Sequence, residues 1–291
     1  MKVLVLGASG MLGHRLLLHF AERGLEVKGT LRQDEAAYRR FGLFPASRCF
    51  FGIDLRREGD LQRVLEEFRP QAVVNAAGIV KQREEGKQAL PSLEINAVLP
   101  HRLAQLCEPL GARIVHMSTD CVFSGARGNY RESDPIDVTD LYGLTKYLGE
   151  LREGNCLTLR TSIVGPELDR KHGLFEWFLA QQGTVKGFRN AIYTGFSTME
   201  MARILEMLLV KSPDARGLYH VSSEPISKYE LLCKIKAQAG LSTEIVPDET
   251  FRCDRSLDST RFREAFGYTP PSWDAMVAEL CAQGRTAPQH V

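Results

Sequence analysis

Short apolar runs alternate with amphipathic segments through the first half of the chain. The runs are rich in Val, Ile and Leu and predict buried strands at 2–6, 25–31, 50–53, 72–76, 113–117 and 157–160. Between them, apolar residues recur at helical spacing over 11–23, 56–68 and 93–110. Strands that alternate with helices predict βαβ units with right-handed crossovers. The expected fold class is therefore α/β, with a Rossmann-like doubly wound parallel sheet.

After about residue 165 the pattern becomes less regular. Helical patterns and one short strand pattern follow at 174–182, 199–210, 217–221 and 227–239. Ser227, with Glu230 three residues later, is a capping-box signature for the last helix. We therefore expect a Rossmann domain at 1–165 with some later segments returning to it, a smaller, mainly substrate-binding α/β lobe at 166–283, and a polar tail at 284–291.

Composition narrows the class of protein. The chain has 291 residues, 44% of them hydrophobic, and a formal net charge of +1, so strong attraction to nucleic acid or to an anionic membrane is not expected. No apolar run approaches the roughly 20 residues that cross a bilayer. The apolar start at 1–6 is too short for a secretory signal. We expect a cytoplasmic protein, and the sequence allows a homodimer.

Cysteines and histidines show no metal-binding pattern. Each type occurs seven times, without a CxxC or HExxH arrangement. We therefore expect no metal site and reduced thiols rather than a disulfide framework. His116, inside a predicted strand, is expected to be a core residue with a hydrogen-bonded tip.

A glycine-rich loop follows the first strand and opens the first helix. Gly7, Gly10 and Gly13 form a GxxGxxG pattern. Glycines let the backbone turn tightly and approach a pyrophosphate, which the helix N-terminus attracts through its unpaired N–H groups. The spacing differs from the GxGxxG dinucleotide fingerprint, so a tight turn without a ligand remains the alternative.

The end of the second strand bears on which dinucleotide is preferred. An acidic residue there binds the adenosine ribose of NAD, whereas this chain has Arg32. A guanidinium matches a 2′-phosphate in a bidentate way, so NADP(H) is favoured. Asp34, close behind, keeps NAD(H) as an alternative, and a solvated surface arginine is the other interpretation of Arg32.

Polar and small residues also follow the next strands, where ligands bind in open α/β sheets. Asp54 and Leu55 follow the third predicted strand, and Asn75 begins the NAAG segment at the end of the fourth. Asp54 has the alternative role of capping the helix that follows. The remaining candidates for cofactor contacts are Ala76, Ala77, Gly78 and Asn96.

Tyr142 and Lys146 carry the strongest chemical signal. Residues four apart share one face of a helix, so the phenol and the ammonium project together. A neighbouring ammonium stabilises phenolate, which makes a tyrosine a usable general acid for ketone reduction. The YxxxK spacing alone also fits a surface pair. The fifth strand supports the chemical interpretation because it ends in Ser118 and Thr119, whose hydroxyls are suited to align a carbonyl.

Taken together, the motifs resemble a known group. GASGMLG, NAAG, STDCVFSG, YGLTK and RTSIVGP occur in the order found in the extended short-chain dehydrogenases, and most resemble the dTDP-4-dehydrorhamnose reductase family. The resemblance covers nearly the whole chain. It implies that Thr119, Tyr142 and Lys146 are catalytic. It also implies a cofactor site formed by Gly7, Ser9, Gly10, Met11, Leu12, Arg32, Asp54, Leu55, Ala76, Ala77, Gly78, Asn96, Ser118, Tyr142, Lys146 and Thr161.

The implied activity is reduction by NAD(P)H of a 4-keto group on a nucleotide-linked deoxysugar, in the synthesis of cell-surface polysaccharide precursors. This chain departs from the family pattern at Cys121, where a tyrosine is usual, and at Ile163, where a tryptophan is usual. Both positions face the sugar in the family, so a related UDP-linked N-acetylated sugar is as plausible a substrate as dTDP-4-dehydrorhamnose. The implied substrate-binding residues are Thr119, Asp120, Cys121 and Ile163. Arg189, together with Arg252 or Arg255, is a candidate for binding the substrate pyrophosphate, because the second lobe must supply cations for it.

Two rival functions share this fold. The first is a nucleotide-sugar epimerase or dehydratase. Dehydratases place a glutamate where this chain has Cys121, which argues against dehydration. The second is a non-catalytic NADP-binding regulatory subunit, like that of methionine adenosyltransferase. The complete set of Thr119, Tyr142 and Lys146 favours an enzyme over that subunit.

Overall fold

A computed structural model describes residues 1–81, 84–168 and 173–286. His172, His290 and the end of the expected tail lie outside the described residues. The chain folds as two compact units. The first contains Met1–Thr119, Thr139–Leu159 and Ala202–Leu218, and the second contains Asp120–Val138, Arg160–Met201 and the chain from Tyr219 onward. No helix in the described part is both long and apolar enough to cross a membrane.

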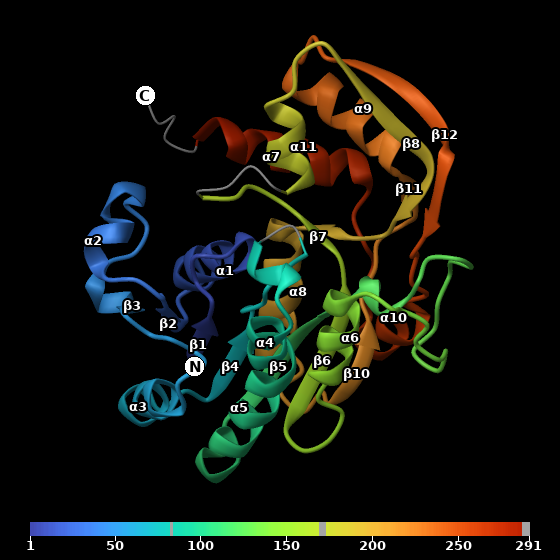
Figure 1. Cartoon of the computed structure of the whole chain (residues 1–291). Helices are drawn as coiled ribbons and strands as arrows, with labels where there is room; N and C mark the ends of the chain where they lie inside the picture. The colour runs from blue at the N-terminus through green and yellow to red at the C-terminus, as the bar shows by residue number, and fades with distance from the viewer. Residues whose placement is uncertain (82–83, 169–172, 287–291) are drawn as a thin grey trace. The chain divides into compact units, whose positions relative to one another are not determined.

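A seven-stranded sheet forms the centre of the first unit (Figure 1). Its strand order is β10 (Gly217–His220), β6 (Cys156–Thr161), β5 (Arg113–Thr119), β4 (Ala72–Asn75), β1 (Lys2–Leu6), β2 (Glu26–Thr30) and β3 (Cys49–Phe50). β1 pairs in parallel with β2 and β4, and β4 pairs in parallel with β5. The predicted α/β class is confirmed, and five of the six predicted strands lie within a residue or two of their expected positions.

The third strand is where the prediction was wrong. We expected it at 50–53, but β3 covers only Cys49–Phe50. Gly52 takes a left-handed conformation with φ of 69°, which strand geometry does not allow. The chain therefore turns before Ile53, whose apolar side chain is nevertheless buried.

Helices cover the sheet of the first unit. Leu4, Leu6 and Val73 point to one face, where they pack with apolar residues of α3 and α5. Gly29 of β2 lies against Leu17 of α1, which places α1 on the other face. The helices of this unit are α1 (Met11–Glu22), α2 (Glu35–Tyr38), α3 (Glu58–Phe68), α4 (Ala89–Ser92), α5 (Leu99–Cys107), α6 (Leu141–Leu148) and most of α8 (Thr198–Val210).

The expected helix at 93–110 is part of a longer helical run with a change of pitch. A π-helical segment, Leu93–Val98, joins α4 to α5, and a 3₁₀ turn, Glu108–Leu110, follows α5. Asn96 is fully buried in the π segment and bonds to the backbone of Ile79 through both amide atoms, at 2.9 Å each. Such segments are frequent at functional sites because they re-aim side chains.

The second unit contains elements that the periodicity did not predict. Its three-stranded sheet has the order β11 (Ile226–Ser227), β8 (Thr184–Tyr193) and β12 (Glu244–Asp254), and a smaller pair joins β7 (Ile163–Val164) to β9 (Phe196–Ser197). Its helices are α7 (Leu174–Leu179), α9 (Lys228–Ala239), α10 (Thr260–Phe266) and α11 (Trp273–Thr286). The capping box of Ser227 and Glu230 on α9 is confirmed, and α11 continues into the expected tail.

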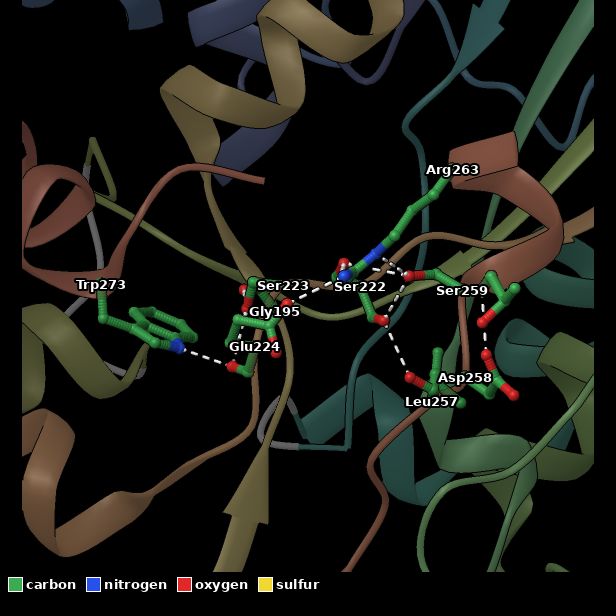
Figure 2. A network of polar contacts seen from close by, with 10 residues as sticks. Gly195, Ser222, Ser223, Glu224, Leu257, Asp258, Ser259, Arg263 and Trp273 are labelled. Atoms are coloured by element: carbon green, nitrogen blue, oxygen red, sulfur yellow. Dashed lines mark hydrogen bonds and ion pairs between the residues drawn. The ribbon is translucent and has the colours of Figure 1, made fainter. Parts of the chain in front are cut away.

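Hydroxyl groups fix the turn that follows β10 in the second unit. Ser222 Oγ bonds to Leu257 O at 2.8 Å and to Ser259 Oγ at 2.9 Å, and Arg263 Nε donates to Ser259 Oγ at 3.0 Å (Figure 2). The indole N–H of Trp273 donates to Glu224 O at 2.7 Å. The bonds to Leu257 O and Glu224 O satisfy backbone carbonyls, and the two bonds to Ser259 Oγ join side chains to one another.

Candidate active site

The glycine loop is built by contacts that leave no room for side chains. Gly7 has φ of 76°, and a Cβ there would lie 2.9 Å from Ala77 Cα. A Cβ on Gly13 would lie 2.1 Å from Gly7 O. Helix α1 begins after Gly10 without a side-chain cap, so the amides of its first turn point outward without an intrahelical acceptor. The loop therefore presents bare backbone and a positive helix end.

Charged residues at the ends of β2 and β3 already have partners. Arg32 Nη1 lies 3.4 Å from Glu85 Oε1, and the arginine side chain is 63% exposed. Asp54 is bound by Arg56 through its guanidinium and its amide, at 2.5 and 3.1 Å. The hydrogen bond from Arg56 lowers the pKa of Asp54 to about 2. Helix α3 has Arg57, not Asp54, at its N-cap position, so the expected capping role is wrong.

A buried network holds the NAAG segment against the glycine loop. The amide N–H of Ala77 donates to Asn75 Oδ1 at 3.2 Å, and Asn75 Nδ2 lies 3.2 Å from His116 Nδ1. Burial, together with the charge of Lys146, holds the pKa of His116 well below its usual value, so the ring is neutral and Nδ1 accepts. The expectation of a core histidine is confirmed, but only its Nδ1 is hydrogen-bonded, because Nε2 is buried with no hydrogen-bond partner among the described residues. The network fixes which way the Asn75 amide faces and thereby orients Ala77.

Helix α6 carries the phenol and the ammonium. Asp140 caps it by accepting from the amide of Gly143 at 2.8 Å. Gly149 ends it at a point where a Cβ would lie 2.0 Å from Asn96 O, so α6 sits directly on the π segment. Tyr142 and Lys146 are one turn apart on α6, as predicted, and Tyr142 is partly exposed whereas Lys146 is buried.

Lys146 is directed toward the end of β5. Its Nζ donates to Met117 O at 2.5 Å. Burial lowers the pKa of Lys146 to about 8, and the charge of Glu150 opposes that change. At neutral pH the side chain therefore remains an ammonium, held in a site with little water.

The hydroxyls that end β5 lie in the same part of the first unit. Ser118 and Thr119 are both buried. Ser118 Oγ donates to Glu150 Oε1 at 2.9 Å, so this proton is directed into the protein. Glu150 was not among the predicted site residues. Its position four residues after Lys146 was the available signal, but its burial was not readable from the sequence.

Three residues expected to bind substrate gather in the second unit. Arg255 Nη1 lies 3.7 Å from Cys121 Sγ, and its Nε donates to Phe123 O at 2.8 Å. Asp120, next to Cys121, is buried. The phenol of Tyr193 lies near both, and burial, then the charges of Asp120 and Cys121, raise its pKa well above the usual range. Tyr193 was not predicted, because it lies in a strand that the periodicity missed.

Other expected residues of the second unit are separate from that group or differently engaged. Arg189 stacks over the ring of Tyr229, with its guanidinium carbon 4.9 Å from the ring centre. Thr161, at the end of β6, is buried, and its Oγ1 donates to Ser162 O at 3.3 Å. Ile163 lies in β7, paired with Phe196 of β9.

The first unit fits a dinucleotide by its own geometry. A pyrophosphate needs bare backbone and free amides, which the loop at Gly7 and the start of α1 provide. The buried ammonium of Lys146 and the partly exposed phenol of Tyr142 come from the helix that packs against β5. No group of three or more metal-ligating side chains occurs among the described residues.

Comparisons with known proteins agree with this geometry. The family model described as RmlD substrate binding domain matches residues 1–286. The spore coat polysaccharide biosynthesis protein SpsK of Bacillus subtilis is 28% identical, over 98% of this chain and 99% of its own length. A dTDP-4-dehydrorhamnose reductase of Aggregatibacter actinomycetemcomitans is 24% identical, over 97% of this chain and 98% of its own length.

Two further comparisons bear on the rival interpretations. The methionine adenosyltransferase 2 subunit beta of Xenopus laevis is 25% identical, over 80% of this chain and 70% of its own length. The dTDP-4-dehydrorhamnose reductase of Bacillus anthracis, solved in complex with NADP, has the same fold, with a TM-score of 0.80 at 21% identity over 97% of this chain and 99% of that one. By the family match, which spans all but the last few residues, the chain belongs to the RmlD substrate binding domain family.

Proposed function

We propose that the protein is an NADPH-dependent reductase that converts a ketone of a nucleotide-linked deoxysugar into an alcohol. The observation that carries the proposal is the buried ammonium of Lys146, one helical turn from Tyr142 and bonded to the strand that ends at Thr119. Burying the charge of a lysine costs free energy, and ionisable groups whose pKa is shifted by burial cluster at functional sites.

Different residues of the first unit are proposed to bind different parts of the cofactor. The loop at Gly7, Gly10 and the amides of Met11 and Leu12 would hold the pyrophosphate, and Arg32 would pair with a 2′-phosphate. The turn at Ala77 would line the nicotinamide side, fixed there by Asn75. The other cofactor contacts that we propose in this unit are Ser9, Asp54, Leu55, Ala76, Gly78, Asn96 and Ser118. Thr161, which belongs to the second unit, is a further proposed cofactor contact.

The chemistry is divided between the cofactor and three side chains. The reduced nicotinamide supplies the hydride. Tyr142 donates a proton to the oxygen of the ketone as its bond to carbon becomes single, and Lys146 stabilises the phenolate that remains. Thr119 donates a hydrogen bond to the same oxygen and aligns it with the phenol. Asp120, Cys121, Ile163, Arg189 and Arg255 are proposed to contact the substrate.

The relatives support a role in deoxysugar or polysaccharide precursor synthesis, since two of them are named for such steps. A 4-keto group is the reacting group that dTDP-4-dehydrorhamnose carries. We propose that the substrate sugar is linked to dTDP or to UDP. We further propose a cytoplasmic location. From the net charge of +1 we propose that the protein has no nucleic-acid partner. A homodimer is tested by light scattering in solution.

A substrate panel tests the proposal. Purified protein is mixed with NADPH and with dTDP- and UDP-linked 4-keto-6-deoxysugars, and the absorbance of the reduced nicotinamide is followed. The proposal predicts oxidation of NADPH with at least one of them. Thermal stabilisation by NADPH without oxidation by any sugar would favour the regulatory-subunit alternative. Interconversion of sugar epimers without net oxidation would favour an epimerase.

A further inference from the structure

A buried carboxylate lies directly behind the predicted catalytic helix. The side chain of Glu150 is only 1% exposed. One of its oxygens accepts from Ser118 Oγ at 2.9 Å, and the other lies 3.1 Å from Arg152 Nη2. Its backbone amide donates to Tyr147 O at 3.0 Å, which holds Glu150 close to the end of α6, two residues after Leu148. A buried acid with this many partners is fixed in position.

The carboxylate of Glu150 and the ammonium of Lys146 are anchored at neighbouring points of β5. Lys146 lies four residues earlier, with its Nζ bonded to Met117 O at 2.5 Å. Burial and the charge of Glu150 affect the pKa of Lys146 in opposite directions, burial lowering it and Glu150 raising it. The two anchor points, Met117 O and Ser118 Oγ, are consecutive positions of β5.

Other titratable groups around Lys146 do not supply the opposing charge. His116, on β5, is neutral because burial and Lys146 hold its pKa far below the usual value. His101, on α5, is engaged with Leu148 O at 2.7 Å. Arg152 carries the same charge as Lys146. The carboxylate of Glu150 is therefore the anionic influence on the lysine.

We propose that Glu150 is a positioning residue of the reductase site, which keeps the Lys146 ammonium charged and, through Ser118, ties the end of β5 to the end of α6. The proposal rests on the proposed function and deepens it. Glu150 touches neither the sugar nor the nicotinamide. It acts through Lys146, whose charge supports proton donation by Tyr142, and through the strand that presents Thr119.

The test measures the titration of Lys146 directly. The full-length protein is labelled with ¹³C at lysine Cε, and the resonance absent from Lys146→Met is followed against pH. Glu150→Gln keeps an oxygen that accepts from Ser118 but removes the charge, so the midpoint of Lys146 is expected to fall by about one pH unit or more. Glu150→Asp restores the charge and should return the midpoint toward wild type. Glu153→Gln, an exposed site three residues away, is the matched control and should leave the midpoint unchanged.

The kinetic readout should move in the same direction. With an active substrate, the alkaline fall of kcat/KM should begin at lower pH in Glu150→Gln than in wild type. A Lys146 midpoint unchanged in Glu150→Gln overturns the proposal, whatever the activity. The titration needs no substrate, so it can be read even if no substrate is found. If the wild-type protein is inactive but Glu150→Gln still lowers the Lys146 midpoint, only the proposed function is rejected. If Glu150→Gln does not fold, Arg152→Gln is used in its place, because the Arg152 side chain is half-exposed. This change removes the cation that pairs with Glu150, so the Lys146 midpoint should rise. A Lys146 midpoint that does not rise then overturns the proposal.

Discussion

Lys146 Nζ donates to Met117 O across 2.5 Å, so the ammonium on α6 is fixed to the strand that ends at Thr119. The bond joins the element that carries the phenol to the element that carries the aligning hydroxyl. It also explains how a charged side chain that is 5% exposed can be retained, because the carbonyl partly replaces lost water.

The first prediction concerns pH. Burial lowers the pKa of Lys146 to about 8, and the proposed mechanism needs the ammonium. We expect kcat/KM to fall as the pH rises through about 8, by roughly tenfold per unit well above it. Lys146→Arg keeps its charge throughout the range, so any activity it retains should lack this fall. A wild-type rate that stays constant up to the ordinary lysine pKa would contradict the assignment.

The same shift has a consequence for stability. The folded state favours neutral Lys146, whereas the unfolded chain keeps the lysine charged up to its ordinary pKa of 10.5. Between about 8 and 10.5 the unfolded state binds more protons, so this residue makes unfolding less favourable as the pH rises. Its contribution to the pH dependence should disappear in Lys146→Met, as measured by urea unfolding across that range.

The second prediction tests the glycine loop. In Gly13→Ala the new Cβ would meet Gly7 O at 2.1 Å, so the loop must shift. We expect a loss of about 2–3 kcal/mol in unfolding free energy and at least tenfold weaker NADPH binding. Gly59→Ala is the control, since Gly59 lies in α3 with nothing near its Cβ position. It should stabilise the protein by about 0.5–1 kcal/mol and leave binding unchanged.

The third prediction concerns cofactor choice. Arg32→Ala removes the cation that we assign to the 2′-phosphate, and a charge-assisted hydrogen bond contributes about 1.5–3 kcal/mol. The Kd of NADPH should therefore rise more than tenfold, whereas that of NADH should change little. Fluorescence titration of both cofactors measures the difference. Equal losses for the two cofactors would instead mean that Arg32 acts only through its pairing with Glu85.

The fourth prediction concerns an ion-pair cluster in the first unit. Glu206 of α8 lies 2.7 Å from Nε2 of His19, on α1, and 2.8 Å from Nε of Arg23, the residue that follows α1. Burial opposes its ionisation, but the hydrogen bonds from Arg23 and His19 outweigh burial and lower its pKa. Glu206→Gln should lose about 1 kcal/mol at neutral pH.

The sign of the pH effect follows from that lowered value. The stabilisation by Glu206 is present above its ordinary pKa of 4.5 and is lost as the pH falls through the lower folded value. The wild-type and Glu206→Gln unfolding free energies should therefore converge in acid. Glu22→Gln, at an exposed α1 site paired with Arg15, should change stability by less than about 0.5 kcal/mol.

Sequence patterns predicted the first unit well because its strands are continuous apolar runs, such as Val3–Leu6 and Val73–Val74. They did not predict β8 and β12, whose exposed positions interrupt the apolar pattern. In β12, Pro247 and a register shift between Asp248 and Arg252 break the alternation further. An alternating apolar pattern arises where one face of a strand is buried, and β8 and β12 have few buried positions.

The candidate site was predicted as a set of residues but not as a set of contacts. The spacing of Tyr142 and Lys146 predicted a shared helix face, and the structure has it. Spacing carried no information on the direction of the Ser118 hydroxyl or on the pairing of Asp54 with Arg56. Both depend on which neighbours tertiary folding brings within hydrogen-bond distance.

The central claim is that Tyr142 delivers a proton while hydride reaches a sugar ketone. It is tested most directly with NADPH deuterated at the transferable position and a 4-keto nucleotide sugar, by mass spectrometry of the product. We predict one deuterium at the former ketone carbon per cofactor oxidised, and a rate reduced by about 10²–10⁴ in Tyr142→Phe with NADPH binding retained. Unlabelled sugar products throughout the panel, or transfer as fast in Tyr142→Phe as in wild type, would contradict the account.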